Sequence, residues 1–192
     1  PENIAFTPES TSTPHLLATN DALIAVVQWM RTDPAWSLHI LRHEQQFRQK
    51  PLRLDGIRVI PDGWVELRYH AADGIDRFVF AIEVQHRGHT DIDDIREKVR
   101  NYIAIAKAGV HKAYFDDPKL PMVVLFLGTK GAAKVAAIKD AFEAELKEKR
   151  NWADMFYVAP FTREIVEEHM VYELPVWERA FSSERRALLD WV

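Results

Sequence analysis

Residues 61–85 have the sequence PDGWVELRYHAADGIDRFVFAIEVQ, and this stretch decides the fold that we predict. Two runs of β-branched and aromatic residues flank the polar turn Ala72-Asp73-Gly74. Such residues favour strands and Asp-Gly favours a tight turn, so the segment predicts an antiparallel hairpin. Pro61-Asp62 opens the first arm and Glu83-Val84-Gln85 closes the second. Because the arms of a hairpin run side by side, we expect these two ends to lie together.

Apolar periodicity on both sides of the hairpin predicts helices and further strands. In chain order the expected ranges are 19–30 (helix), 36–40 (strand), 57–69 (strand-turn-strand or strand-bulge-strand), 78–85 (strand), 92–106 (helix), 122–127 (strand), 132–149 (helix), 155–158 (strand) and 162–192 (helical segments). The order α-β-β-β-α-β-α-β predicts an α/β fold with a mixed central sheet flanked by helices.

The composition is that of one ordinary globular domain. The chain has 192 residues, of which 47% are hydrophobic and 28% charged, so it can fill one core. We expect a single domain over residues 15–192. Residues 1–14, rich in Thr, Ser, Pro and Glu, predict a flexible tail or linker remnant, and the start at Pro1 without Met suggests a fragment. No apolar run reaches the roughly 20 residues of a membrane span, so we expect a soluble, cytoplasmic protein without membrane contact.

Several kinds of site are excluded by residue type. The chain has no Cys, which excludes disulfides, thiolate nucleophiles, iron–sulfur clusters and Cys-ligated zinc. The pairs His39/His43 and His86/His89 lack an obvious third ligand, so zinc is not expected. The net charge of −4 gives no overall basic surface, and contact with DNA would need a local patch.

The two ends of the hairpin predict a metal site. Residues two apart in a strand face the same side, so Glu83 and Gln85 would both point towards Asp62. Two carboxylates and an amide or backbone oxygen form the hard, oxygen-rich site that Mg²⁺ or Mn²⁺ accepts. Such an ion activates water and neutralises a phosphate. Asp62 and Glu83 are therefore the expected metal ligands.

Pro61-Asp62 and Glu83-x-Gln85 resemble the motif of the PD-(D/E)XK nuclease superfamily. This resemblance implies a restriction-endonuclease-like core and makes Asp62, Glu83 and Gln85 candidate catalytic residues. The third motif position is commonly Lys, whereas Gln85 cannot supply positive charge to a phosphate. Lys98, early on the next predicted helix, is the candidate substitute, and Tyr102 one turn later would touch phosphate.

A narrower resemblance covers roughly half of the chain. Residues 15–21, Ile82-Glu83-Val84, Arg87-Gly88 and residues 96–102 resemble the replication-relaxation proteins of plasmids and conjugative elements. This implies DNA processing or DNA binding on a mobile element, with Arg87 as a further substrate contact. Those proteins usually carry an N-terminal winged helix, which is not visible in this sequence. The expected partners are DNA, and a second copy of the chain or other mobile-element proteins.

A plainer interpretation exists for each residue. Pro-Asp-Gly is common turn chemistry, so Asp62 could simply form a turn. Lys98 could be a solvated lysine, and Tyr102 could belong to the core. Glu83 is harder to dismiss, because an unpaired carboxylate after the apolar run 78–82 would be costly to bury. The leading function is a metal-dependent DNA nuclease or DNA-processing domain, and the alternative is a catalytically inactive DNA-binding or scaffold module.

Overall fold

The computed structural model describes residues 13–86, 92–162 and 171–190. The helices are α1 (Thr13–Trp29), α2 (Glu44–Gln49), α3 (Ile92–Lys107), α4 (Val110–Tyr114), α5 (Ala132–Leu146) and the 3-10 helices η1 (Arg150–Met155) and η2 (Leu188–Asp190). The strands are β1 (Trp36–His43), β2 (Leu52–Leu54), β3 (Ile57–Val59), β4 (Gly63–Ala71), β5 (Gly74–Gln85), β6 (Val123–Gly128), β7 (Phe156–Pro160) and β8 (Glu178–Arg179). None of the described helices combines the length and apolar character needed to cross a bilayer.

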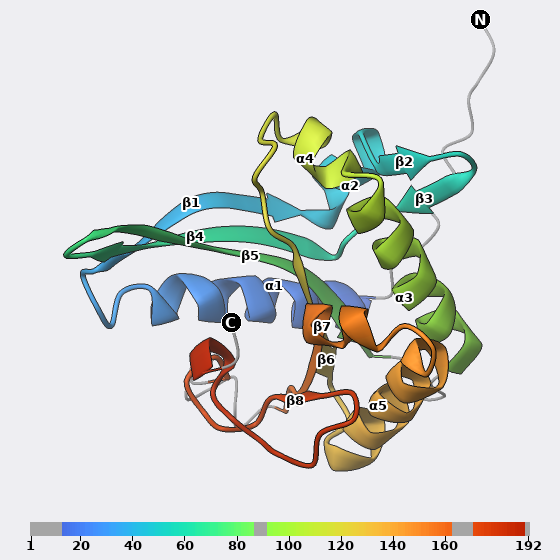
Figure 1. Ribbon diagram of the computed structural model, residues 1–192. Coiled ribbons are helices and arrows are strands. Elements are labelled where there is room, and N and C mark those ends of the chain that lie inside the picture. The colour runs from blue at the N-terminus through green and yellow to red at the C-terminus, as the bar shows by residue number, and fades with distance from the viewer. Residues whose placement is uncertain (1–12, 87–91, 163–170, 191–192) are drawn as a thin grey trace, which may run out of the picture.

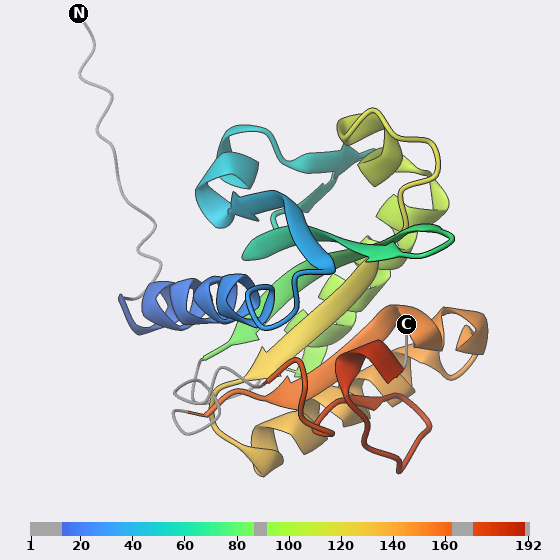
Figure 2. The same cartoon turned by 90° about the vertical axis from the view of Figure 1, so that its left-hand side faces the viewer.

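A six-stranded mixed sheet forms the centre of the molecule, in the order β1-β4-β5-β6-β7-β8. The pairs β1/β4, β4/β5 and β7/β8 are antiparallel, whereas β5/β6 and β6/β7 are parallel. Helix α1 packs on one face of this sheet, and α3 and α5 pack on the other (Figures 1 and 2). The predicted α/β architecture with a mixed sheet flanked by helices is thereby confirmed. Strands β2 and β3 form a separate two-stranded sheet.

The register of β4 and β5 determines which polar residues meet. The hairpin is paired from Gly63↔Ile82 to Ala71↔Gly74, as predicted from the turn. Strand β1 pairs with the other side of β4, and its last pair is His43↔Gly63. Antiparallel pairing therefore gathers the end of β1, the start of β4 and the end of β5 at one edge of the sheet.

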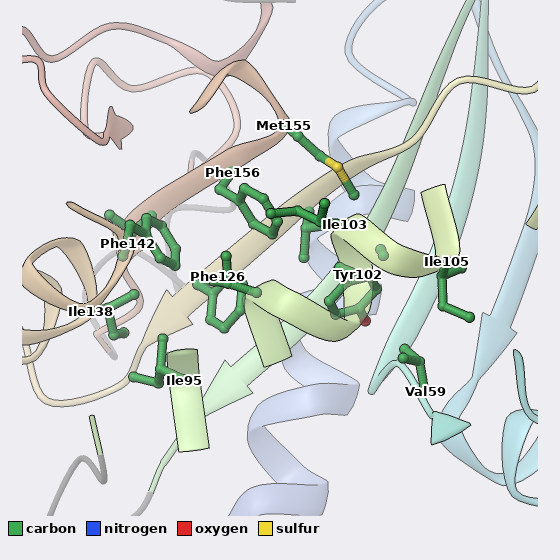
Figure 3. Packing of buried hydrophobic residues seen from close by; sticks show 14 of the residues in the cluster. Val59, Ile95, Tyr102, Ile103, Ile105, Phe126, Ile138, Phe142, Met155 and Phe156 are labelled. Carbon is green, nitrogen blue, oxygen red and sulfur yellow. The ribbon is translucent and has the colours of Figure 1, made fainter. Parts of the chain in front are cut away.

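The larger core lies between the sheet and helices α3 and α5 (Figure 3). Side chains alternate along a strand, and Val79 and Ala81 of β5 belong to this core, whereas Phe80 and Ile82 belong to the core under α1. Glu83 continues the first series and so points to the α3 face. A carboxylate thus enters an apolar layer at the position where α3 crosses β5.

Two segments differ from the prediction near the N-terminus. Helix α1 begins at Thr13, not near Thr19, because Pro14 is compatible with a first helical turn and Thr19 is buried within the helix. The predicted tail over 1–14 therefore ends inside α1, and residues 1–12 lie outside the described part. The polar stretch 44–50 forms α2, where the Gln46 side chain accepts a hydrogen bond from the His43 backbone N–H.

The prediction of C-terminal helical segments is wrong for residues 171–190. This stretch contains the short strand β8 and the single 3-10 turn η2. Pro175 interrupts any helix between Val171 and Trp177, since proline removes a backbone donor and restricts the residue before it. The indole of Trp177 is fully buried, and its Nε1–H donates to the Val171 carbonyl at 2.7 Å. Residues 163–170, 191 and 192 lie outside the described part.

One buried histidine gives a prediction about pH. His111 of α4 is 2% exposed, and its Nε2–H donates to the Leu120 carbonyl at 3.0 Å. Burial lowers the pKa of His111 below its usual value. The unfolded chain then binds an extra proton below about pH 6.5, so acid favours unfolding. We expect the free energy of unfolding to fall from pH 7 to pH 5, with His111 contributing up to about 1.4 kcal/mol per pH unit.

Urea unfolding at pH 7, 6 and 5 measures this dependence. His111→Gln keeps a donor but cannot titrate, so its curve should be flatter than that of the wild type. His39→Gln, at an exposed position of β1, is the matched control and should follow the wild type. Parallel curves for wild type and His111→Gln would contradict the assignment.

Candidate functional site

Asp62 lies at the edge of the sheet where β1, β4 and β5 meet, immediately before β4. It is 6% exposed, and its Oδ2 accepts a hydrogen bond from the Val84 backbone N–H at 2.7 Å. Its Oδ1 lies 3.1 Å from Nε2 of His15 in the first turn of α1. The Glu44 backbone N–H donates to the Asp62 carbonyl at 3.0 Å. These contacts fix the Asp62 side chain beside the end of β5, next to Glu83.

Glu83 is 1% exposed and both of its carboxylate oxygens have partners on α3. Its Oε1 accepts a hydrogen bond from the Tyr102 hydroxyl at 2.6 Å, and its Oε2 forms an ion pair with the Lys98 ammonium. Lys98 and Tyr102 meet the same carboxylate because residues four apart lie on one face of a helix. The Lys98 side chain as a whole remains 41% exposed, so part of it reaches solvent. The structure thus brings together Asp62, Glu83, Lys98 and Tyr102.

The electrostatics of the two carboxylates differ. Burial raises the pKa of Glu83, and the nearby Lys98 charge offsets only part of this effect. Burial acts in the same sense on Asp62, but the His15 hydrogen bond and the Lys98 charge outweigh it and hold the pKa of Asp62 below its usual value. Partial burial disfavours the Lys98 charge, yet Glu83 and Asp62 raise the pKa of Lys98 above its usual value. The ammonium of Lys98 is therefore charged at neutral pH.

The phenol of Tyr102 is held as a donor. Its side chain is 1% exposed, and burial together with the Glu83 carboxylate raises the pKa of Tyr102 well above the usual value. A neutral phenol donates a hydrogen bond to Glu83, which fixes the orientation of that carboxylate. The observed partner of the Tyr102 hydroxyl is Glu83. The contact of Tyr102 with phosphate stays a prediction.

Two further residues, His15 and Glu44, join the site and were missed by the sequence analysis. Ligand atoms of His15, Glu44 and Asp62 all lie within 4.8 Å of one another, a spacing that suits a shared cation. Glu44 is 8% exposed and forms an ion pair with Arg48, one turn along α2, at 2.7 Å. Glu44 could have been found only with the full length of β1, which extends to His43, whereas the predicted strand ended at residue 40. His15 carried no local signal, since only the packing of α1 brings it to Asp62.

The other predicted site residues are placed as follows. Gln85 ends β5, is half-buried, and its backbone carbonyl accepts a hydrogen bond from the Thr129 N–H at 3.3 Å. It follows Glu83 on the same face of the strand. Arg87 lies outside the described residues.

A small pocket opens beside the ion pair of Glu83 and Lys98. Its volume is about 300 Å³, and residues of β3, the segment after it, β5 and α3 line it. Buried carboxylates, a charged ammonium and an adjoining cavity are the components with which a protein binds a cation and an anionic substrate.

Comparison with known families agrees with the narrower resemblance. The family model described as Replication-relaxation matches residues 2–116, which is more than half of the 192 residues. The matched region contains Asp62, Glu83, Lys98 and Tyr102, together with His15 and Glu44. A search of curated proteins finds no match to the chain. Membership suggests a role in the replication or relaxation of a mobile element. The chain belongs to the replication-relaxation family.

Proposed function

We propose that this chain is a PD-(D/E)XK-type, metal-dependent domain that cleaves or processes the DNA of a mobile element. One observation carries this proposal: Asp62, Glu83 and Lys98 converge at one end of the β4–β5 hairpin, where two buried carboxylates lie beside a lysine whose side chain is partly exposed. The succession α1, β1, β4, β5, α3, β6 supports a restriction-endonuclease-like core. DNA is the proposed substrate. A second copy of the chain or another mobile-element protein stays a predicted partner.

The donor atoms at the site suit Mg²⁺ or Mn²⁺. Carboxylate oxygens of Asp62 and Glu83 would hold the ion, and Glu44, which offers a ligand atom within 4.8 Å of those of Asp62 and His15, supplies a further one. These are the hard ligands that both metals prefer. The imidazole of His15 adds a nitrogen ligand, which suits Mn²⁺ better than Mg²⁺. When bound, such an ion supplies an activated water and neutralises charge on a phosphodiester.

The chain's own residues have separable tasks in this proposal. Lys98 carries positive charge on a side chain that reaches solvent, so it can turn from Glu83 to the charge that develops on the attacked phosphate. Tyr102 keeps its hydrogen bond to Glu83 and positions that carboxylate. Lys98 thereby takes the task that Gln85, which has no charge, cannot perform.

A catalytically inactive DNA-binding module is the second candidate function. Gln85 favours it, because the strand position two residues after Glu83 carries no cation. The ion pair between Lys98 and Glu83 also favours it, since each charge already has a partner without any metal. In this case the same edge of the sheet would bind DNA without cleaving it.

A cleavage assay on end-labelled single-stranded, duplex and branched DNA tests the proposal. We expect products with Mn²⁺ or Mg²⁺ and none with EDTA. Glu83→Gln keeps the size of the side chain but removes the charge that would hold the ion, and it should lose cleavage. Glu97→Gln changes the same residue type at an exposed position of α3 and should cleave like the wild type.

The outcome separates the two candidate functions. Cleavage that persists in Glu83→Gln would contradict this site. If the wild type binds these DNAs and cleaves none of them, while Gln85→Lys gains metal-dependent cleavage, the chain is an inactive module on a nuclease-like fold.

A further inference from the structure

The pocket beside Glu83 and Lys98 has two walls. Strand β3 and the residue after it contribute Arg58, Val59 and Ile60, and helix α3 contributes Asn101 next to Tyr102. Val59 points from β3 towards α3, and Tyr102 lies on the facing turn of the helix (Figure 3). We call this cavity the α3 pocket. It lies on the α3 side of Glu83, whereas His15 and Glu44 lie around Asp62.

The charges around the α3 pocket favour an anion. The carboxylate of Glu83 is already met by the Lys98 ammonium and the Tyr102 hydroxyl. Arg58 is exposed on β3, and within the described residues it forms no ion pair. The lining therefore holds two cations, Arg58 and Lys98, against one carboxylate. A phosphate at the mouth of the pocket would gain a bidentate partner in Arg58 without competition from another acid.

The apolar lining residues and the size of the α3 pocket favour a single planar base. Val59 and Ile60 offer apolar surface, and the Tyr102 ring borders the same space. The side-chain amide of Asn101 offers both a donor and an acceptor, which is what the polar edge of a base requires. A volume of about 300 Å³ is at the lower end for ligand pockets and suits a ligand of the size of one nucleotide.

We propose that the α3 pocket binds one unpaired nucleotide of a single DNA strand, with Arg58 on its phosphate and Asn101 on the edge of its base. The inference rests on the proposed function and makes it more specific, because it places an unpaired nucleotide next to the phosphodiester that Lys98 would reach. Single-stranded DNA or an unpaired end is then the preferred substrate over a continuous duplex.

Fluorescence anisotropy with a labelled 12-nucleotide oligodeoxythymidine in EDTA tests binding apart from cleavage. Arg58→Ala should weaken binding about tenfold and reduce the salt dependence by about 0.7 of a log–log slope unit, the contribution of one phosphate contact on a single strand. Arg53→Ala is the matched control, because Arg53 is the cross-strand partner of Arg58 on the same hairpin, is exposed, and does not line the pocket. It should lower affinity by less than twofold.

Base contact is tested with the same assay. Asn101→Leu keeps the approximate size of the side chain but removes its donor and acceptor. We expect the wild type to distinguish oligodeoxythymidine from oligodeoxycytidine, and we expect this difference to shrink in Asn101→Leu.

Three results would overturn the inference: no binding of the oligonucleotide by the wild type, equal losses in Arg58→Ala and Arg53→Ala, or equal affinity for a 12-base-pair duplex. Failure of the proposed function looks different. If binding depends on Arg58 but no DNA is cleaved with Mn²⁺, the results support the assignment of the α3 pocket and contradict the proposed nuclease activity. If cleavage depends on Glu83 but Arg58→Ala does not change binding, the results support the nuclease activity and contradict the assignment of the pocket.

Discussion

Replacing Lys98 with alanine is expected to lower the cleavage rate by about 100- to 1000-fold, roughly 2.7–4 kcal/mol of transition-state stabilisation. Lys98 is the cation that the structure holds at Glu83, and Gln85 cannot replace its charge. DNA affinity should fall only slightly, because one phosphate contact among several is lost. Tyr102→Phe should cost much less, since the phenol orients Glu83 without contributing charge. Single-turnover cleavage and equilibrium binding, measured on the same DNA, separate the two effects.

The removal of Lys98 also leaves Glu83 buried with fewer partners, so the fold itself needs a control. Lys98→Gln retains a donor for Glu83 and removes only the charge, and it should be as slow as Lys98→Ala. Lys107→Ala removes an exposed lysine in the last turn of α3 and should leave the rate unchanged. A Lys98→Gln variant that folds and cleaves at the wild-type rate would show that Lys98 has no part in the chemistry.

Adding Mn²⁺ is expected to raise the midpoint of thermal unfolding by about 5–10 °C when the ion is present at 100 times its dissociation constant. A ligand that binds only the folded chain then stabilises it by about 2.7 kcal/mol, and each kcal/mol is worth about 2–4 °C for a chain of this size. The physical cause is that Asp62 lies near two other buried carboxylates, Glu44 and Glu83. A cation offsets the repulsion between such carboxylates. Differential scanning calorimetry with and without Mn²⁺ measures the shift.

Two aspartates of the same hairpin provide the comparison. Asp62→Asn should abolish the shift, because it removes the one carboxylate charge that lies near both Glu44 and Glu83. Asp73→Asn, in the exposed turn at the opposite end of the hairpin, should preserve it. An unchanged midpoint of the wild type at millimolar Mn²⁺ would contradict a cation site here.

The parts of the fold that were predictable are those with strong local signals. The β4–β5 hairpin combines an Asp-Gly turn with two β-rich arms, and α3 combines apolar spacing with acids in its first turn. The predicted strand over 122–127 and the helix beginning near 132 correspond to β6 and α5. The C-terminal segment over 162–192 was predicted to be helical. In its described part, Pro175 interrupts a helix and the burial of Trp177 holds the chain in an irregular path.

The candidate site was predictable only where its residues belong to the hairpin or to the helix that follows it. Asp62 and Glu83 were expected together because hairpin pairing is local in sequence. Lys98 and Tyr102 were expected on one helix face because they are four residues apart. His15 and Glu44 were not expected, because their approach to Asp62 depends on how α1 and the end of β1 pack.

The sequence by itself therefore determined the hairpin, the helix after it and the residue types that face each other across them, because these depend on the periodicity of neighbouring residues. Only the tertiary structure decided that both carboxylate oxygens of Glu83 have partners, one in Lys98 and one in Tyr102. It also decided that ligand atoms of Asp62, His15 and Glu44 lie close together and that a pocket opens between β3 and α3. Contacts between segments distant in the chain arise from the packing of helices on the two faces of one sheet. Apolar periodicity marks the buried face of a helix, but it does not show which residues of a distant segment that face meets.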